Sequence, residues 1–371
     1  MKTEMKLAGL LGVGALSIIF CGLSFIETSQ IALQWLLQAS LLWCWVWRET
    51  WQRSDLNRVH AEAPLLSQLG WANRLTLLRG YLIALTGGFL FQPQPDGIMS
   101  WVPGLLYGAA AILDRLDGFV ARKSKQTTLL GAELDNRFDA LGLLVAPLLA
   151  HGFGKIHWSY LLLSVAFYVF QWGLQWRRNR GLAVYVLMPS QLRRAMAGFQ
   201  MGFVALVLLP LFEARQTLLC SFAFMIPVLL GFAVDWLVVS GRIDTQASAT
   251  KRVFARLAVF SANIFQPALR VFLFVGLLFL ARQMELSFAS AYENIFLIFG
   301  LVLGISFVLL GLAGRIGALI ILLVLGCHSI DITVWDIAVM CSAVWILLLG
   351  TGRFSLWQGD DIWVNQQDGA A

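Results

Sequence analysis

The stretch of sequence that decides this fold is DRLDGFVARKSKQTTLLGAELDNRFD, residues 114–139. Four aspartates stand in it as two pairs, three and four residues apart, in a chain that is otherwise mostly apolar: Asp114, Asp117, Asp135 and Asp139. A charged carboxylate at the centre of a bilayer costs about 3 kcal/mol by insertion scales, so several of them on adjacent apolar segments predict a task such as holding metal ions. The alternative is a chance placement of acids at helix ends, which the helical spacing within each pair disfavours.

The composition is that of a polytopic membrane protein. Of the 371 residues, 59% are hydrophobic and 13% are charged, and the mean hydropathy is +0.75. Soluble globular proteins carry about 25% charged residues. The net charge of +6 does not indicate a nucleic-acid partner, because the basic residues cluster at the ends of apolar segments, as the positive-inside rule expects. The five cysteines are scattered through apolar runs and suggest neither disulfides nor a metal site.

Apolar stretches of about 17 to 25 residues, long enough to cross a bilayer, predict an all-α protein with about twelve transmembrane helices. The expected spans are 7–26, 31–51, 73–92, 98–121, 131–151, 157–176, 193–212, 217–240, 263–281, 292–312, 315–330 and 335–351. Lys and Arg concentrate on one side of this arrangement, which places both termini and the aspartates at the cytoplasmic face. We therefore expect an integral membrane protein, of the inner membrane if the source is bacterial, with the aspartates at the cytoplasmic face.

Four parts are expected along the chain: a two-helix membrane hairpin at 1–51, a core of one interfacial helix and six spans at 52–242, a polar linker at 243–262, and a four-helix block with a polar tail at 263–371. The interfacial helix is expected near Pro64, because proline is favoured in a first helical turn. The tryptophans of the second hairpin helix are expected to anchor it at the headgroup level. Arg270, inside an apolar stretch, is expected to extend its side chain to the membrane surface.

The spacing of the aspartates predicts that they converge. Residues three, four and seven apart share one face of a helix, so Asp114 and Asp117 look in one direction, and Asp135 and Asp139 share a face of the next helix. Two facing helices joined by a short basic turn can therefore bring the four carboxylates together. Small residues let the two backbones approach closely and leave room for a ligand; they are Gly118, Ala121 and Gly131.

Four clustered carboxylates repel one another unless cations balance their charge. Carboxylate oxygens suit Mg²⁺ or Mn²⁺, and the motif contains no His or Cys that would favour zinc. Two such ions commonly clamp a phosphate or pyrophosphate and stabilise both the attacking and the leaving oxygen of a displacement. The residues thus predict a two-metal site for phosphoryl-type transfer at a membrane surface.

The pattern D-x2-D-G-x2-A-R-x8-G-x3-D-x3-D resembles that of the CDP-alcohol phosphatidyltransferase family, and residues 114–139 meet all of its fixed positions. The heptapeptide that begins at Asn73, N-x-x-T-x-x-R, is similar to the start of the family's first core helix. The resemblance covers about residues 62–242. It implies transfer of a phosphatidyl or other substituted phosphate group from CDP-diacylglycerol or a CDP-alcohol to an acceptor alcohol, with release of CMP, in phospholipid biosynthesis. A homodimer among membrane lipids is compatible with it.

The resemblance also implies a role for each matching residue. The metal ligands would be Asp114, Asp117, Asp135 and Asp139. Asp139 would in addition be the catalytic base that deprotonates the acceptor hydroxyl. The substrate-binding residues around the nucleotide and its phosphates would be Asn73, Thr76, Gly118, Ala121 and Arg122.

The acceptor and the overall class of function leave alternatives open. Arg193 and Arg194, at the expected cytoplasmic start of a core helix, could bind an anionic acceptor together with Arg137; they could equally be positive-inside anchors. The other classes are a cation-coupled transporter, whose acids coordinate an ion, and a non-catalytic membrane scaffold. The C-terminal block weakly resembles the DoxX-like membrane family in two glycine-rich stretches, 311–315 and 349–356.

Overall fold

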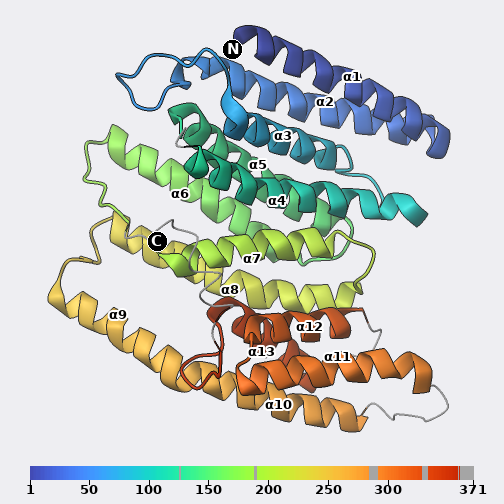
Figure 1. Cartoon of the computed structure of the whole chain (residues 1–371), viewed down its shortest axis with the longest axis vertical. Coiled ribbons are helices and arrows are strands. Elements are labelled where there is room, and N and C mark those ends of the chain that lie inside the picture. The colour runs from blue at the N-terminus through green and yellow to red at the C-terminus, as the bar shows by residue number, and fades with distance from the viewer. Residues whose placement is uncertain (125–126, 188–189, 284–290, 328–332, 358, 360–371) are drawn as a thin grey trace. The chain divides into compact units, whose positions relative to one another are not determined.

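The computed structural model describes residues 1–124, 127–187, 190–283, 291–327, 333–357 and 359 (Figure 1). In these residues the protein is all-helical, as expected, and an isolated β-bridge joins Leu312 to Trp357. The α-helices are α1 (Lys2–Ile26), α2 (Ser29–Gln52), α3 (Gly70–Gly87), α4 (Val102–Lys123), α5 (Leu129–Gly152), α6 (Leu162–Asn179), α7 (Gln191–Val207), α8 (Ala214–Val239), α9 (Ser248–Phe260), α10 (Gln266–Gln283), α11 (Ala291–Leu310), α12 (Gly314–Gly326) and α13 (Val334–Leu349). A π-helical turn at Ser261–Phe265 joins α9 to α10 without a break.

Each of the twelve expected spans overlaps with one of these helices. Among the described residues, four helical segments are long and apolar enough to cross a membrane: Lys2–Ile26, Gly97–Lys123, Ala214–Val239 and Ser248–Leu280. Three shorter apolar helices follow them, at Leu297–Leu310, Gly314–Gly326 and Val334–Leu349. The structure therefore fits a membrane protein, while the count of twelve spans and the six-helix core stay predictions.

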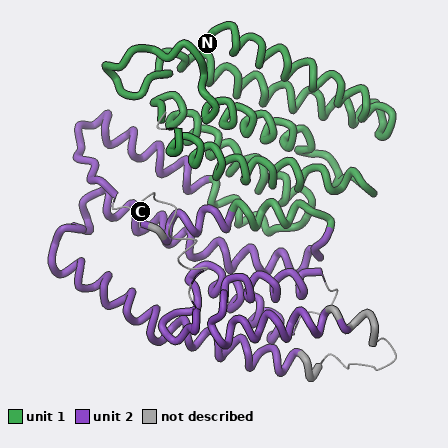
Figure 2. The backbone as a smooth tube through the Cα atoms, in the orientation of Figure 1, with its two compact units in different colours: residues 1–164, 201–210 green, residues 165–200, 211–371 purple. Residues whose placement is uncertain are grey.

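The chain forms two compact units, residues 1–164 with 201–210 and residues 165–200 with 211–371 (Figure 2). In the first unit α3 packs against α2, α4 and α5, and α1 packs against α2. Leu209 belongs to this unit and lies against Gly104 of α4. Because α3 contacts both aspartate helices, its residues can reach the carboxylates on each of them.

Tryptophans of α2 pack inside the first unit. Trp35 and Trp43 are 2% and 3% exposed, so the expectation that they anchor the helix at the headgroup level was wrong. The Nε1 of Trp43 donates to the carbonyl oxygen of Gly9 at 3.4 Å, and that of Trp47 donates to the carbonyl oxygen of Met5 at 3.1 Å. A Cβ on Gly9 would lie 2.7 Å from Trp47 Nε1. The glycine therefore leaves the space on α1 that an indole ring fills.

The segment between α2 and α3 consists of turns and a short 3₁₀ helix (Ser54–Leu56), so the interfacial helix expected near Pro64 was wrong. Asn57 organises this segment. Its side-chain Nδ2 donates to the carbonyl oxygens of Gln68 at 2.8 Å and Leu66 at 3.4 Å, and its backbone carbonyl oxygen accepts from Leu66 N at 2.9 Å. An asparagine side chain thus satisfies backbone groups that a helix would have paired, which is how such residues compete with helix formation.

In the second unit α10 packs against α13, and α12 packs against α11 and α13. Arg270 of α10 is 6% exposed and does not extend to the membrane surface as expected. It donates to the carbonyl oxygens of Val308 at 2.9 Å, Phe354 at 3.0 Å and Thr351 at 3.3 Å, and to that of Leu309. The expectation was wrong because backbone carbonyls at the end of α11 and after α13 converge on the guanidinium, and such carbonyls attract a cation.

The two glycine-rich stretches of the second unit lie against each other. Arg315 Nη1 donates to the carbonyl oxygen of Leu347 at 2.8 Å. A Cβ on Gly311 would lie within 3 Å of Ser355, so this approach requires glycine. Helix α9 falls inside the expected polar linker, and most of the expected polar tail lies outside the described residues. The boundaries between the four expected parts stay predictions.

Candidate active site

Helices α4 and α5 carry the aspartates on two consecutive helix ends, as the spacing predicted. Asp114 and Asp117 lie toward the end of α4, and Asp135 and Asp139 lie toward the start of α5. The N-cap of α5 is Thr128, whose Oγ1 accepts a backbone hydrogen bond from the first turn at 3.0 Å. A threonine there satisfies an amide that has no partner inside the helix, so the sequence itself favours a helix start at this point.

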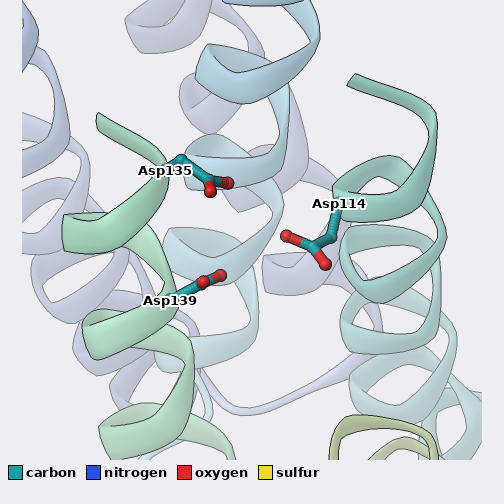
Figure 3. A group of neighbouring side chains, drawn as sticks. All are labelled: Asp114, Asp135 and Asp139. Carbon is teal, nitrogen blue, oxygen red and sulfur yellow. The ribbon is translucent and has the colours of Figure 1, made fainter. Parts of the chain in front are cut away.

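Three of the four carboxylates come together. One oxygen each of Asp114, Asp135 and Asp139 lies within 4.8 Å of the others. Figure 3 shows Asp135 and Asp139 on one helix, with Asp114 opposite them on another. Their side chains are 25%, 48% and 42% exposed, in the order Asp114, Asp135, Asp139. The cluster is therefore open to solvent on one side.

Asp117 lies deeper than the other three aspartates. Its side chain is 8% exposed, and its Oδ2 accepts a hydrogen bond from Thr76 Oγ1 at 2.8 Å. Thr76 is itself buried, at 3% exposure. The threonine thus orients one of the predicted metal ligands, and its predicted contact with substrate phosphates stays a prediction.

A buried arginine joins all four aspartates. Arg79 of α3 is 1% exposed. Its Nη1 contacts Asp114 Oδ1 and lies 2.9 Å from Asp135 Oδ1 and 3.6 Å from Asp117 Oδ2, while its Nη2 lies 3.3 Å from Asp139 Oδ1. Arg79 was not among the residues predicted from the sequence, although it is the last fixed position of the N-x-x-T-x-x-R heptapeptide. That heptapeptide was the signal that could have found it.

The side chain of Asn73 is buried and hydrogen-bonds to other side chains of the protein. It is 3% exposed, and its Nδ2 donates to Asn57 Oδ1 at 3.0 Å and to Thr128 Oγ1 at 3.1 Å. Gly131 of α5 faces it so closely that a Cβ there would lie 2.6 Å from Asn73 Oδ1. Asn73 therefore ties the segment before α3 to the start of α5, and its predicted role in substrate binding stays a prediction.

The three residues predicted to bind the nucleotide follow one another along the end of α4. Gly118 and Ala121 are half-buried, and Arg122 is exposed. The heavy atom nearest to a Cβ built on Gly118 would be Arg122 Nη1, at 3.3 Å. A flexible side chain thus covers this glycine, and its movement would open space for a ligand against the helix.

A network of ion pairs joins the N-terminal hairpin to the aspartate helix. Glu49 of α2 lies 2.8 Å from Arg53 and 2.9 Å from Arg137 of α5. Glu133 of α5 lies 2.9 Å from Arg137 and 3.6 Å from Arg53. Arg137, a candidate ligand of an anionic acceptor from its sequence position, is thus held between two glutamates.

Arg193 and Arg194 stand near the start of α7, in the second unit. Arg193 Nη1 lies 2.8 Å from Asp235 Oδ1 of α8, and the two side chains are 31% and 19% exposed. An anionic ligand would have to compete with Asp235 for Arg193. The predicted role of both arginines in acceptor binding stays a prediction.

The donor chemistry of the aspartate cluster suits a divalent cation. Its ligand atoms are carboxylate oxygens, which Mg²⁺ and Mn²⁺ prefer. Asp139 Oδ1 is buried and lies 3.3 Å from Arg79 Nη2, which leaves the second carboxylate oxygen of Asp139 as the donor for an ion. Arg79 is in contact with four acidic side chains, so the acids that it contacts outnumber it, which favours binding of a further cation.

The family model of the CDP-alcohol phosphatidyltransferases matches residues 69–234, and residues 1–68 and 235–371 lie outside this match. No curated protein and no solved structure matches the chain. The matched segment begins just before α3, ends within α8, and contains the heptapeptide and the four aspartates. The part of the chain that builds the aspartate cluster thus carries the sequence pattern of the CDP-alcohol phosphatidyltransferase family.

Proposed function

We propose that the protein is a membrane-bound, metal-dependent transferase. It moves a phosphatidyl or other substituted phosphate group from CDP-diacylglycerol or a CDP-alcohol to an acceptor alcohol and releases CMP. The observation that carries the proposal is the approach of Asp114, Asp135 and Asp139 to within 4.8 Å, inside a segment that matches the transferase family.

The divalent cation, Mg²⁺ or Mn²⁺, would be held by Asp114, Asp135 and Asp139, and Asp117 would add a further carboxylate oxygen. When bound, such an ion neutralises phosphate charge and polarises phosphate and hydroxyl oxygens. The hydrogen bond from Thr76, at 2.8 Å, fixes the orientation of Asp117. The chain therefore supplies both the donor oxygens and a means of holding one of them in place.

Asp139 would act as the general base. The acceptor oxygen attacks the phosphorus that carries the donor's alcohol, and the bond from this phosphorus to the bridging oxygen of the pyrophosphate breaks. CMP leaves with that oxygen and its electron pair, while the acceptor proton passes to Asp139. The position of Asp139 supports this role, because one of its oxygens lies within 4.8 Å of the oxygens of Asp114 and Asp135 that would hold the ion.

The nucleotide and the acceptor would use residues outside the cluster. Gly118 and Ala121 leave room for the nucleotide beside α4, and the exposed Arg122 would bind its phosphates. From the sequence alone, we propose Arg193 and Arg194 as ligands of an anionic acceptor. Replacing both by glutamine should then raise the KM for a phosphorylated acceptor more than the KM for an uncharged one.

The test is CMP release by the purified protein, given Mn²⁺, CDP-diacylglycerol and a panel of free and phosphorylated alcohols. We expect CMP and a new phosphodiester with at least one acceptor. Asp139→Asn should lower CMP release about 100-fold or more, the usual size of a general-base contribution. The matched control is Asp96→Asn, an exposed aspartate in the loop before α4, which should keep full activity.

Three results would contradict the proposal in different ways. Full activity in EDTA without added metal would exclude the metal, and full activity of D139N would exclude the base. The absence of CMP from every donor and acceptor pair would exclude the transferase. Ion uptake by proteoliposomes in that last case would favour the cation-coupled transporter.

A further inference from the structure

Arg79 reaches the aspartate cluster from its buried side. Its side chain is 1% exposed, whereas those of Asp114, Asp139 and Asp135 are 25%, 42% and 48% exposed. The guanidinium contacts the Oδ1 atom of each of these three residues. Since a carboxylate has two oxygens, each aspartate can bind the arginine with one oxygen and an ion with the other.

The position of Arg79 is fixed by its surroundings. Its Nη2 donates to the backbone carbonyl of Asp135 at 3.0 Å, so it binds the aspartate helix independently of the carboxylates. The next residue, Gly80, packs so tightly that a Cβ there would lie 2.8 Å from Val46 and 3.0 Å from Phe138. The backbone of α3 therefore cannot shift to withdraw the arginine from the cluster without disturbing α2 and α5.

The chemistry of the guanidinium group also suits contact with several carboxylates. It is planar, always charged, and carries five N–H donors in a fixed fork, so a single side chain can contact several carboxylates at once. Lysine has a single nitrogen and could not span the same four residues. Without a cation, the four carboxylates would repel one another and move apart.

We propose that Arg79 is a permanent cation of the metal site. It holds the aspartates together from the buried side in the absence of a divalent ion, and it shares them with the ion when the ion is bound from the solvent side. The inference rests on the proposed function for the nature of the ion. The competing arrangement is a placeholder: an arginine that occupies the cluster only until the ion displaces it.

The experiment measures the melting temperature of the purified protein in EDTA and in saturating Mn²⁺, together with Mn²⁺ affinity from the electron paramagnetic resonance signal of the free ion. Wild type is compared with R79Q and R79K. The matched control is R74Q, which removes another arginine of α3 whose ion pair with Glu4, at 2.8 Å, is partly exposed. All four proteins are assayed without substrate.

In EDTA we expect R79Q to melt about 5 °C or more below wild type, because it leaves four carboxylates without their cation. R74Q should melt within about 2 °C of wild type, as expected for an exposed pair. Mn²⁺ should bind R79Q on the order of tenfold more tightly than wild type, because one positive charge near the ion is gone. Mn²⁺ should therefore raise the melting temperature of R79Q by more than that of wild type or R74Q.

The melting temperature with saturating Mn²⁺ separates a permanent cation from a placeholder. A permanent cation predicts that saturated R79Q still melts below saturated wild type, whereas a placeholder predicts that the two become equal. Equal values would overturn the proposal, and so would an equal Mn²⁺-induced rise in both proteins, weaker Mn²⁺ binding by R79Q, or no Mn²⁺ binding by wild type.

Two further results keep the test decisive. If R79Q does not fold, the melting temperatures of R79K are compared instead. Lysine keeps the charge but lacks the fork of donors, so R79K should melt below wild type in EDTA and in saturating Mn²⁺, by less than is expected for R79Q. CMP release by wild type is a separate measurement. Wild type that binds Mn²⁺ but releases no CMP would refute the transferase and leave the role of Arg79 to be decided by the melting temperatures alone.

Discussion

Gly131→Ala should destabilise the protein, because a methyl group there would displace the Asn73 side chain. Gly131 lies in the first turn of α5, and a Cβ on it would lie 2.6 Å from Asn73 Oδ1 and 3.2 Å from Thr128 Oγ1. The first of these separations is shorter than a Cβ tolerates. Asn73 must then move away from Asn57 and Thr128, to which its Nδ2 now donates at 3.0 Å and 3.1 Å.

The size of the effect follows from the hydrogen bonds involved. Two hydrogen bonds contribute about 1 kcal/mol each, and leaving the buried amide unpaired costs about 1 to 3 kcal/mol more. Alanine is favoured over glycine inside a helix by about 1 kcal/mol, which offsets part of this loss. We therefore expect the free energy of unfolding to fall by about 2 to 4 kcal/mol.

The assay is equilibrium unfolding of the purified protein in detergent micelles, followed by circular dichroism. The matched control is Gly14→Ala in α1, where a Cβ would meet nothing within 4 Å, so its stability should be unchanged or slightly higher. The double variant G131A/N73A gives a second check. Once the asparagine side chain is gone the clash disappears, so the double variant should be no less stable than N73A alone.

Two outcomes would refute this reasoning about Gly131. G131A as stable as G14A would mean that the close approach to Asn73 has no energetic consequence. A double variant whose loss equals the sum of the two single losses would mean that the two positions act independently, contrary to the 2.6 Å approach.

Two further predictions concern charges that the structure holds in place. Glu49→Gln should lower the free energy of unfolding by about 1 to 2 kcal/mol, less than for a fully buried ion pair because Arg137 is partly exposed. The control Glu62→Gln, in an exposed loop, should leave the free energy of unfolding unchanged, and thermal unfolding of both variants checks this. Arg270→Gln removes charged hydrogen bonds to four carbonyls and should cost about 2 to 4 kcal/mol in the same assay, whereas the exposed control Arg256→Gln should melt like wild type.

Local features of the chain were predictable from the sequence. The all-α class and the helices at the expected spans follow from long apolar stretches. The two aspartate pairs were expected on consecutive helix ends because residues three and four apart share a helix face, and Thr128 marks the start of α5. The type of ion that the cluster suits was also predictable, since it depends on the donor atoms alone.

The surroundings of single residues were harder to predict from their neighbours in the sequence. The tryptophans of α2 resemble a headgroup anchor in composition, yet Trp43 is buried because Gly12 of α1 leaves room for its indole ring. Arg270 was expected to extend its side chain to the membrane surface, but the carbonyl oxygens of Val308 and Thr351 accept its hydrogen bonds. In each case the deciding partner lies far away in the sequence.

By itself, the sequence determined the helices, the aspartate spacing and the chemistry of the donor atoms, because each depends on residues within a few turns of one another. Only the tertiary structure decided that Arg79 pairs with Asp114, 35 residues further along the chain. The same holds for Asn73, which packs against Gly131 and hydrogen-bonds to Thr128. The physical reason is packing. Which side chain neutralises a buried carboxylate, or fills the space beside a glycine, depends on how whole helices come together, and no local pattern records that.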